Sequence, residues 1–134
     1  MSKHLERDLD DLQKNIMGLA SLVEQAFSLS IIALRDRNPD IARDVIQGDV
    51  QIDTEENQIN EDCLKILALH QPVAGDLRRC TAAMMIITDL ERMGDEAAKI
   101  ARYALALCEE GESPRGYVET RHIGNQIKVM IHET

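Results

Sequence analysis

Four acidic side chains are the residues of this sequence whose type and spacing point to chemistry. Asp49 and Asp53 are four positions apart, and so are Glu91 and Asp95. On a helix, residues at that spacing lie on one face, about 6 Å from each other. Pro72 is equally far from Asp49 and Asp95, and equally far from Asp53 and Glu91. If the chain reverses at this proline, the two pairs face each other across a helical hairpin.

Carboxylate oxygens are the ligands that hard cations prefer, among them iron, manganese, magnesium and calcium. Without a cation, two like charges at this spacing repel each other by roughly 0.3 kcal/mol per pair. We therefore predict a surface metal site at these four carboxylates. The alternative is that they lie on solvated helix flanks and form ion pairs with Lys99, Arg92 or Arg102.

Residues typical of catalysis do not accompany this set. A di-iron enzyme built on a helical bundle would show Glu-x-x-His pairs, but Gly94 lies three positions after Glu91, and Glu56 three after Asp53. His70 falls on the apolar side of its segment and is expected to form a hydrogen bond at a helix end. We find no nucleophile paired with a base and no glycine-rich phosphate loop. We predict no catalytic residue, and a carboxylate-metal enzyme is the least favoured alternative.

The elements that would position the carboxylates are helices, because apolar residues recur every three or four positions. In the first segment they are Leu5, Leu9, Leu12, Ile16, Leu19, Val23, Phe27 and Leu34. In the third they are Ala83, Ile86, Ile87, Leu90, Met93, Ala97, Ile100, Ala104 and Leu107. Asn38 and Pro39 end the first helix and begin the second as its N-cap and first residue. A second break is predicted at Gln71 and Pro72, and Gly111 is expected to cap the third helix.

Three helices of about 30 residues with short connections must pack as antiparallel neighbours. Aromatic residues make up only 2% of the chain, so aliphatic side chains fill the core. We predict an all-α, antiparallel three-helix bundle over residues 1–111. Ser113 and Pro114 begin a partial fourth helix within residues 112–134, whose apolar face has no later partner in the sequence. We expect either that the chain is a fragment or that this fourth helix packs against a second copy of the chain.

Composition narrows the classes of partner. Fifteen basic against 24 acidic side chains give a net charge of −9, which disfavours nucleic acid and anionic lipid and suits cations or a basic protein surface. The three cysteines show no CxxC spacing, so reduced core thiols are expected. No run approaches about 18 consecutive apolar residues, and we expect a cytoplasmic protein.

Two runs, at residues 71–78 (QPVAGDLR) and 89–95 (DLERMGD), together resemble the signature of the PhoU family of bacterial phosphate-signalling regulators. Residues 48–53 (GDVQID) fit the second-helix motif of that family. The resemblance extends over about residues 5 to 110. It implies two tandem three-helix repeats, of which this sequence would hold the first and the opening helix of the second.

The resemblance also implies a cofactor and partners. Several family members bind iron or zinc clusters on their surface through E(D)xxxD pairs, which by position are the four carboxylates above. The implied role is that of an adaptor, not an enzyme, which contacts a sensor histidine kinase and the ATPase subunit of a phosphate ABC transporter. Such a protein restrains the phosphate-starvation response and is peripheral to the membrane through its partners. A homodimer would restore the six-helix arrangement.

One other interpretation stays open. PhoU-like domains also occur in regulators of other ion transporters. The chain would then be a helical dimerisation or interaction module whose carboxylates bind no metal.

Overall fold

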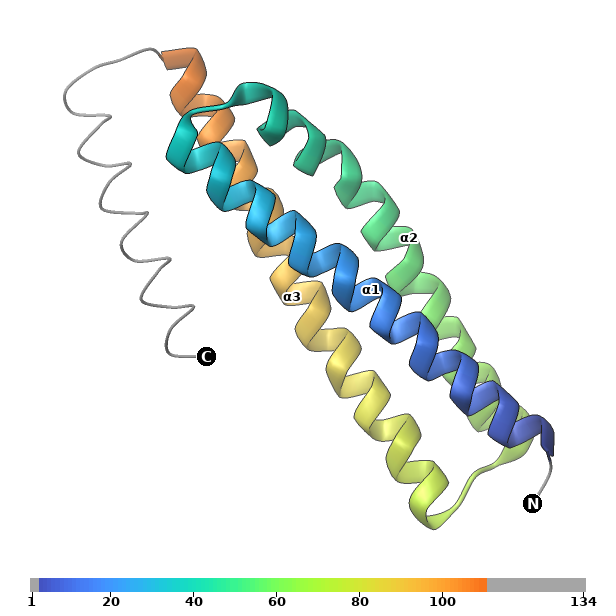
Figure 1. Cartoon of the computed structure of the whole chain (residues 1–134). Helices are drawn as coiled ribbons and strands as arrows, with labels where there is room; N and C mark the ends of the chain where they lie inside the picture. Colours follow the sequence, from blue (N-terminus) through green and yellow to red (C-terminus); the bar gives the residue numbers. More distant parts are fainter. Residues whose placement is uncertain (1–2, 111–134) are drawn as a thin grey trace. The chain divides into compact units, whose positions relative to one another are not determined.

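The computed structural model describes residues 3–110, which form three long helices (Figure 1). They are α1 (Lys3–Asp36), α2 (Pro39–His70) and α3 (Ala74–Glu110). Residues 3–110 contain no strand, which confirms the predicted all-α class. The predicted fourth helix and the cap at Gly111 lie outside the described residues.

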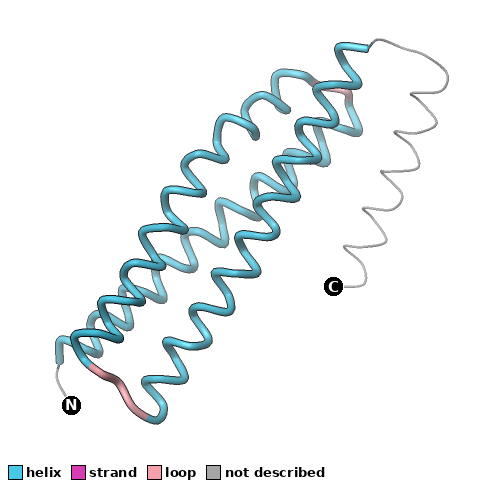
Figure 2. Tube along the Cα trace, turned by 180° about the vertical axis from the view of Figure 1, so that it is seen from behind, coloured by secondary structure: helices cyan, strands magenta, loops and turns pink. Residues whose placement is uncertain are grey.

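The described chain divides into two compact units, each built from one segment of every helix. The first unit comprises residues 3–24 and 50–94, and the second comprises residues 25–49 and 95–110. Within each unit the three segments lie side by side, and consecutive segments run in opposite directions (Figure 2). The loop between α2 and α3 belongs to the first unit, and the loop between α1 and α2 belongs to the second. The antiparallel three-helix arrangement is therefore confirmed.

Aliphatic side chains and two cysteines fill the core of the first unit. Its most deeply buried residues include Leu9, Leu12, Leu19, Val23, Ile52, Ile59, Cys63, Ile66, Cys80 and Ile87. The prediction that Ile86 and Met93 belong to this core is wrong, because Ile86 is 45% exposed and Met93 is 43% exposed. They are seven positions apart and so share one flank of α3, while Ile87 and Leu90 face inward at 1% and 8% exposure.

Small side chains dominate the core of the second unit. Its cluster consists of Ala33, Leu34, Ala42, Val45, Ile100, Ala101, Ala104 and Leu107. Half of these residues are alanines, so the three backbones can approach closely. Phe27, Ile41 and Tyr103 pack against the cluster and close its edges.

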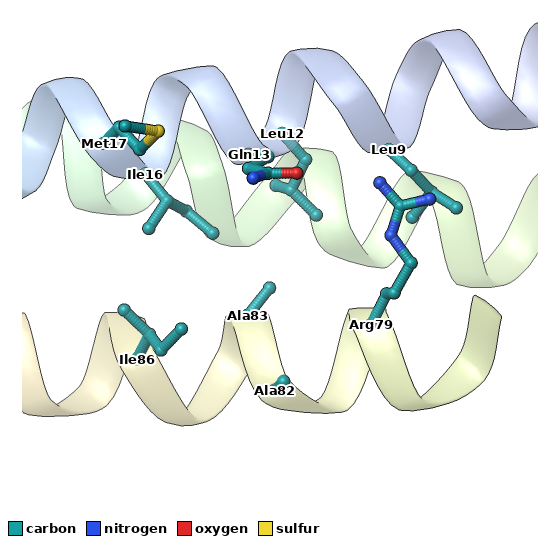
Figure 3. Close-up of a pocket in the computed structure, with 9 residues that line it drawn as sticks. All are labelled: Leu9, Leu12, Gln13, Ile16, Met17, Arg79, Ala82, Ala83 and Ile86. Atoms are coloured by element: carbon teal, nitrogen blue, oxygen red, sulfur yellow. The ribbon is translucent and has the colours of Figure 1, made fainter. Parts of the chain in front are cut away.

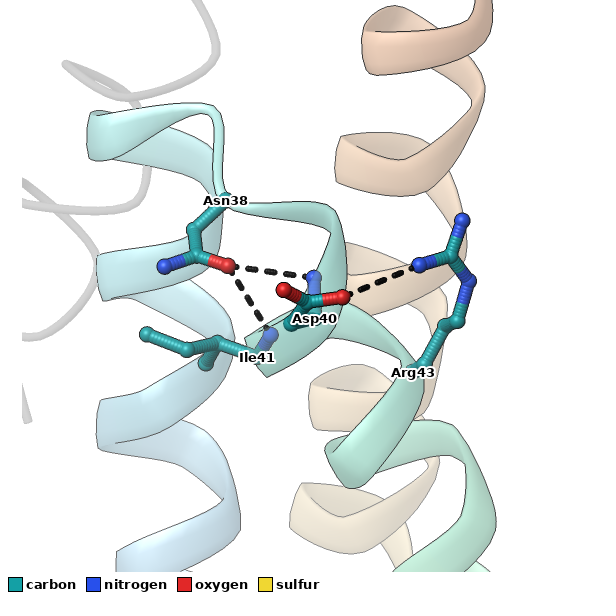
Figure 4. A network of polar contacts seen from close by, with 4 residues as sticks. All are labelled: Asn38, Asp40, Ile41 and Arg43. Carbon is teal, nitrogen blue, oxygen red and sulfur yellow. Dashed lines mark hydrogen bonds and ion pairs between the residues drawn. The ribbon is translucent and has the colours of Figure 1, made fainter.

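The turn between α1 and α2 consists of Arg37 and Asn38. Arg37 adopts the left-handed conformation (φ 50°). The backbone N–H of Asn38 donates to the Ala33 carbonyl oxygen at 3.0 Å, as in a Schellman cap. The Asn38 Oδ1 atom then accepts from the amides of Asp40 (3.0 Å) and Ile41 (3.2 Å) (Figure 4). The predicted N-cap is thus confirmed, and one residue ends a helix and begins the next.

The turn between α2 and α3 needs more backbone strain. Gln71 (φ 44°) and Ala74 (φ 49°) both adopt left-handed conformations that side chains disfavour. His70, the last residue of α2, places Nε2 2.9 Å from Asp8 Oδ2 on α1. This contact confirms the expected hydrogen bond at the helix end, and it ties the turn to α1 within the first unit.

α1 also bears on the question of a membrane span. By length and composition alone, this helix contains a segment apolar enough to cross a membrane, although it has no long uninterrupted apolar run. The core helix of a soluble protein passes the same test, so this result by itself is weak support for a span.

Candidate functional site

The four predicted carboxylates lie on the two helices that the sequence indicated. Asp53 and Glu91 belong to the first unit, and both are exposed. Asp49 and Asp95 belong to the second unit, where Asp49 is half-buried and Asp95 is exposed. Each pair that was predicted to face across the hairpin therefore falls within a single unit.

The ion pairs expected from a solvated helix flank do not form at three of these positions within residues 3–110. Within residues 3–110, Asp53, Glu91 and Asp95 take part in none of the salt bridges of the structure. Lys99 pairs with Glu96, at 3.5 Å, within its own helix. The three exposed carboxylates consequently present their oxygen atoms to solvent.

The donor set fits a hard cation by its chemistry, since every candidate ligand is a carboxylate oxygen. As placed in residues 3–110, however, no three side chains of His, Cys, Asp or Glu form a group that would hold a metal ion. The metal site at the four carboxylates stays a prediction.

A fifth carboxyl group was missed by the sequence reasoning. Glu56 is only 5% exposed, the most deeply buried charged side chain of residues 3–110. A methyl group added at Gly94 would lie 3.7 Å from Glu56 Oε1 and 3.5 Å from Ile52 Cγ2. α3 therefore approaches this carboxyl group at a glycine that lies between Glu91 and Asp95. The signal was present in the sequence, because Glu56 occupies the vacant step between Ile52 and Ile59 on the apolar stripe.

The cysteines behave as predicted for reduced thiols, since all three are free. Burial is the main cause that raises the pKa of the Cys63 thiol, and the nearby Cys80 thiol and Asp62 carboxylate add to it. Burial also raises the pKa of Cys80, which Asp76 increases further and Arg79 opposes. Neither buried thiol is therefore suited to act as a nucleophile.

An apolar groove of about 340 Å³ runs between α1 and α3 in the first unit (Figure 3). Met17 and Ile86 lie toward one end of it, and Arg79 extends across the other end. The Arg79 guanidinium donates to Glu6 Oε1 and to Asp10 Oδ1, each at 3.3 Å. Most of the residues that line this groove are apolar, which suits contact with another molecule.

A second groove, of about 330 Å³, lies between α1 and α2 in the same unit. Its lining differs from the first in carrying several charges, three of them carboxylates. The residues are Asp8, Asp11, Leu12, Asn15, Asp62, Lys65, Ile66 and Leu69.

Comparison with known proteins gives one consistent family. The PhoU domain family matches residues 16–104. A phosphate-specific transport system accessory protein PhoU homolog from Pseudomonas aeruginosa is 44% identical over 99% of this chain. The phosphate-specific transport system accessory protein PhoU of Escherichia coli is 33% identical, also over 99% of the chain. This chain spans 55% and 56% of those two proteins, about half of their length.

A solved structure agrees with the sequence relatives. The crystal structure of PhoU from Pseudomonas aeruginosa superposes with a TM-score of 0.81 at 45% identity. The match covers 96% of this chain and 61% of that one. The fold of the chain and its sequence therefore resemble those of the same family.

Proposed function

The chain belongs to the PhoU domain family, and from that membership we propose that it is an accessory protein of a phosphate-specific transport system. The observation that carries the proposal is the match of 99% of the chain, at 44% identity, to a relative of that name. The role is regulatory and proceeds through protein contacts, with no reaction catalysed by the chain.

The partners that we propose are a sensor histidine kinase and the ATPase subunit of a phosphate ABC transporter, contacted at the cytoplasmic face of the membrane. The surface of the first unit supports a role in binding. It exposes ten large apolar side chains, and within residues 3–110 the second unit exposes none of comparable size and degree. Large apolar side chains that stay exposed in one unit are suited to contact with another protein. A homodimer would use part of the same surface.

We further propose that a hard or borderline cation, such as an iron or zinc cluster, or manganese, magnesium or calcium, binds at Asp49, Asp53, Glu91 and Asp95. The support is an oxygen-only set of ligands, three of which are exposed and outside the salt bridges of the described chain. A bound cation would offset the repulsion between neighbouring carboxylates and reduce the negative charge of this surface.

The regulatory role is tested in a bacterium whose own PhoU homolog has been deleted. With phosphate in excess, expression of the chain should lower a reporter of the phosphate-starvation response toward the wild-type level. An unrelated three-helix protein of similar charge, expressed to the same level, is the control. If the reporter stays as high as in the deletion strain while the chain is folded and abundant, the proposed function is wrong.

The metal site is tested by elemental analysis of the purified chain. The fourfold variant is Asp49→Asn, Asp53→Asn, Glu91→Gln and Asp95→Asn. The matched control removes four exposed acids from the same two helices, through Asp44→Asn, Glu61→Gln, Asp89→Asn and Glu109→Gln. Metal should accompany the wild-type chain and the control but not the variant. Equal metal in all three proteins, or none after supplementation, would contradict the site.

A further inference from the structure

The groove between α1 and α2 in the first unit combines an apolar floor with a charged rim. Leu12 and Ile66 form the floor and are only 3% and 4% exposed. Leu69 stands at the edge and is 75% exposed, one of the two most exposed large apolar side chains of residues 3–110 together with Val73 at 70%. A leucine so placed is available to pack against a ligand that enters the groove.

The rim of this groove is anionic. Three carboxylates, those of Asp8, Asp11 and Asp62, line it together with a single ammonium group, that of Lys65. Asp8 contacts His70 at 2.9 Å, and Asp62 accepts from the Gln58 side chain. Asp11 is exposed and takes part in no salt bridge within residues 3–110.

We propose that this groove binds an amphipathic helix of a partner protein, with leucine-like side chains on one face and lysines or arginines beside them. A groove with an apolar floor suits a helix whose apolar residues recur at i, i+3, i+4 and i+7. The carboxylates of the rim would attract and orient basic side chains that flank this face. The inference names the chemistry of a partner for the accessory role proposed above, and it rests on that role.

The charge of the chain separates this occupant from two others. A second copy carries the same net charge of −9 and would meet the anionic rim with repulsion on average. An anionic lipid surface would be repelled for the same reason. A basic amphipathic helix is attracted at long range by the negative charge of the chain, and its apolar face can pack against the floor of the groove.

The probe for the test is a synthetic helix of about 18 residues, which spans roughly 27 Å. It carries leucines at the four spacings above with flanking lysines, and a second peptide replaces every lysine with glutamate. Fluorescence anisotropy with the full chain should show binding of the lysine peptide, weakening as salt rises from about 0.05 to 0.3 M. Equal binding of the glutamate peptide would overturn the proposal.

Variants of the protein locate the binding. The double variant Asp11→Asn and Asp62→Asn should bind the lysine peptide about fivefold more weakly, the loss expected for two exposed ion pairs. Leu69→Gln should weaken binding by a similar or larger factor, because it removes an apolar contact. The matched control, Glu61→Gln with Asp89→Asn, removes the same charge from exposed positions outside the groove lining and should stay within about twofold of wild type.

Equal weakening by both double variants would show attraction to overall charge and would overturn the groove assignment. Sedimentation of the chain alone tests whether a second copy occupies the groove. If the wild-type chain forms a dimer and Leu69→Gln abolishes it, the groove is an interface between copies, and the proposal of a partner helix is overturned. Failure of the inference is separable from failure of the proposed function. If the groove variants repress the starvation reporter as fully as wild type does, the function stands and the groove assignment is wrong.

Discussion

The side-chain environments of the three cysteines differ enough to predict their reactivity. Cys63 and Cys80 are 1% and 0% exposed, whereas Cys108 is half-buried. The thiolate is the reactive species, and burial raises the pKa of both Cys63 and Cys80. Iodoacetamide near neutral pH should therefore alkylate Cys108 first, at least about tenfold faster than the other two. Peptide mapping by mass spectrometry measures the three rates.

The pH dependence of that reaction follows from the direction of the pKa shifts. A raised pKa means that Cys63 and Cys80 carry less thiolate than an ordinary thiol until the pH passes the raised value. Denaturation in urea should remove the difference between the three thiols, because it restores ordinary environments. If Cys80 reacts as fast as Cys108 in the native chain, the core of the first unit is not packed as described.

Gly94 is a residue whose replacement by alanine should be tolerated. The added methyl group would meet Ile52 and Glu56 at 3.5 and 3.7 Å, which is ordinary van der Waals contact. Alanine is favoured over glycine within a helix by about 1 kcal/mol. Gly94→Ala should thus raise the free energy of unfolding by up to about 1 kcal/mol in urea titration. Gly94→Leu should lower it by about 1–3 kcal/mol through overpacking. A loss of stability in the alanine variant would imply a closer approach of α2 and α3.

At the scale of elements, the turn after α1 is strained at one residue. Arg37 has a φ of 50°, a conformation that costs a residue with a Cβ atom roughly 1–2 kcal/mol relative to glycine. Glycine loses part of that gain through the entropy of the unfolded chain. Arg37→Gly should raise the free energy of unfolding by about 0.5–1 kcal/mol.

The control for that substitution lies inside α1. Lys14→Gly removes the same charge from an exposed helical position and should lower stability by roughly 0.7 kcal/mol. Opposite signs for the two glycine variants would establish the left-handed cap. If both destabilise the chain, Arg37 contributes contacts that outweigh its backbone strain.

At the scale of the molecule, the two units depend on different side chains. Ala101 is 0% exposed in the alanine-rich core of the second unit, so a larger side chain would force the helices apart. Ala101→Leu should lower the free energy of unfolding by about 1–3 kcal/mol. Ala106→Leu, at an exposed position of the same helix, should change it by less than about 0.5 kcal/mol. Similar effects at the two positions would contradict the close packing of this unit.

The first unit carries the exposed apolar surface and both described grooves. Binding of partners is therefore expected to alter this unit more than the second. The four candidate carboxylates are divided between the two units. Asp53 and Glu91 belong to the first, and Asp49 and Asp95 belong to the second.

The three helices and the two breaks between them could be predicted from the sequence alone. The spacing of apolar residues predicted each helix because the 3.6-residue period depends only on neighbours along the chain. The ends at Asn38 and Gln71 were predicted for the same reason: capping hydrogen bonds and left-handed turns involve residues within five positions of each other. The positions of the four candidate carboxylates on α2 and α3 were likewise available from the sequence.

Only the tertiary structure decided which flank of each helix is covered. Ile86 and Ile87 are equally apolar, yet one is 45% exposed and the other 1%, because that difference depends on where α1 and α2 lie. The burial of Glu56 against Gly94 and the two grooves of the first unit were decided in the same way. Burial is set by contacts between residues far apart in the sequence, and the pattern along a single helix specifies an apolar stripe but not the width that its neighbours cover.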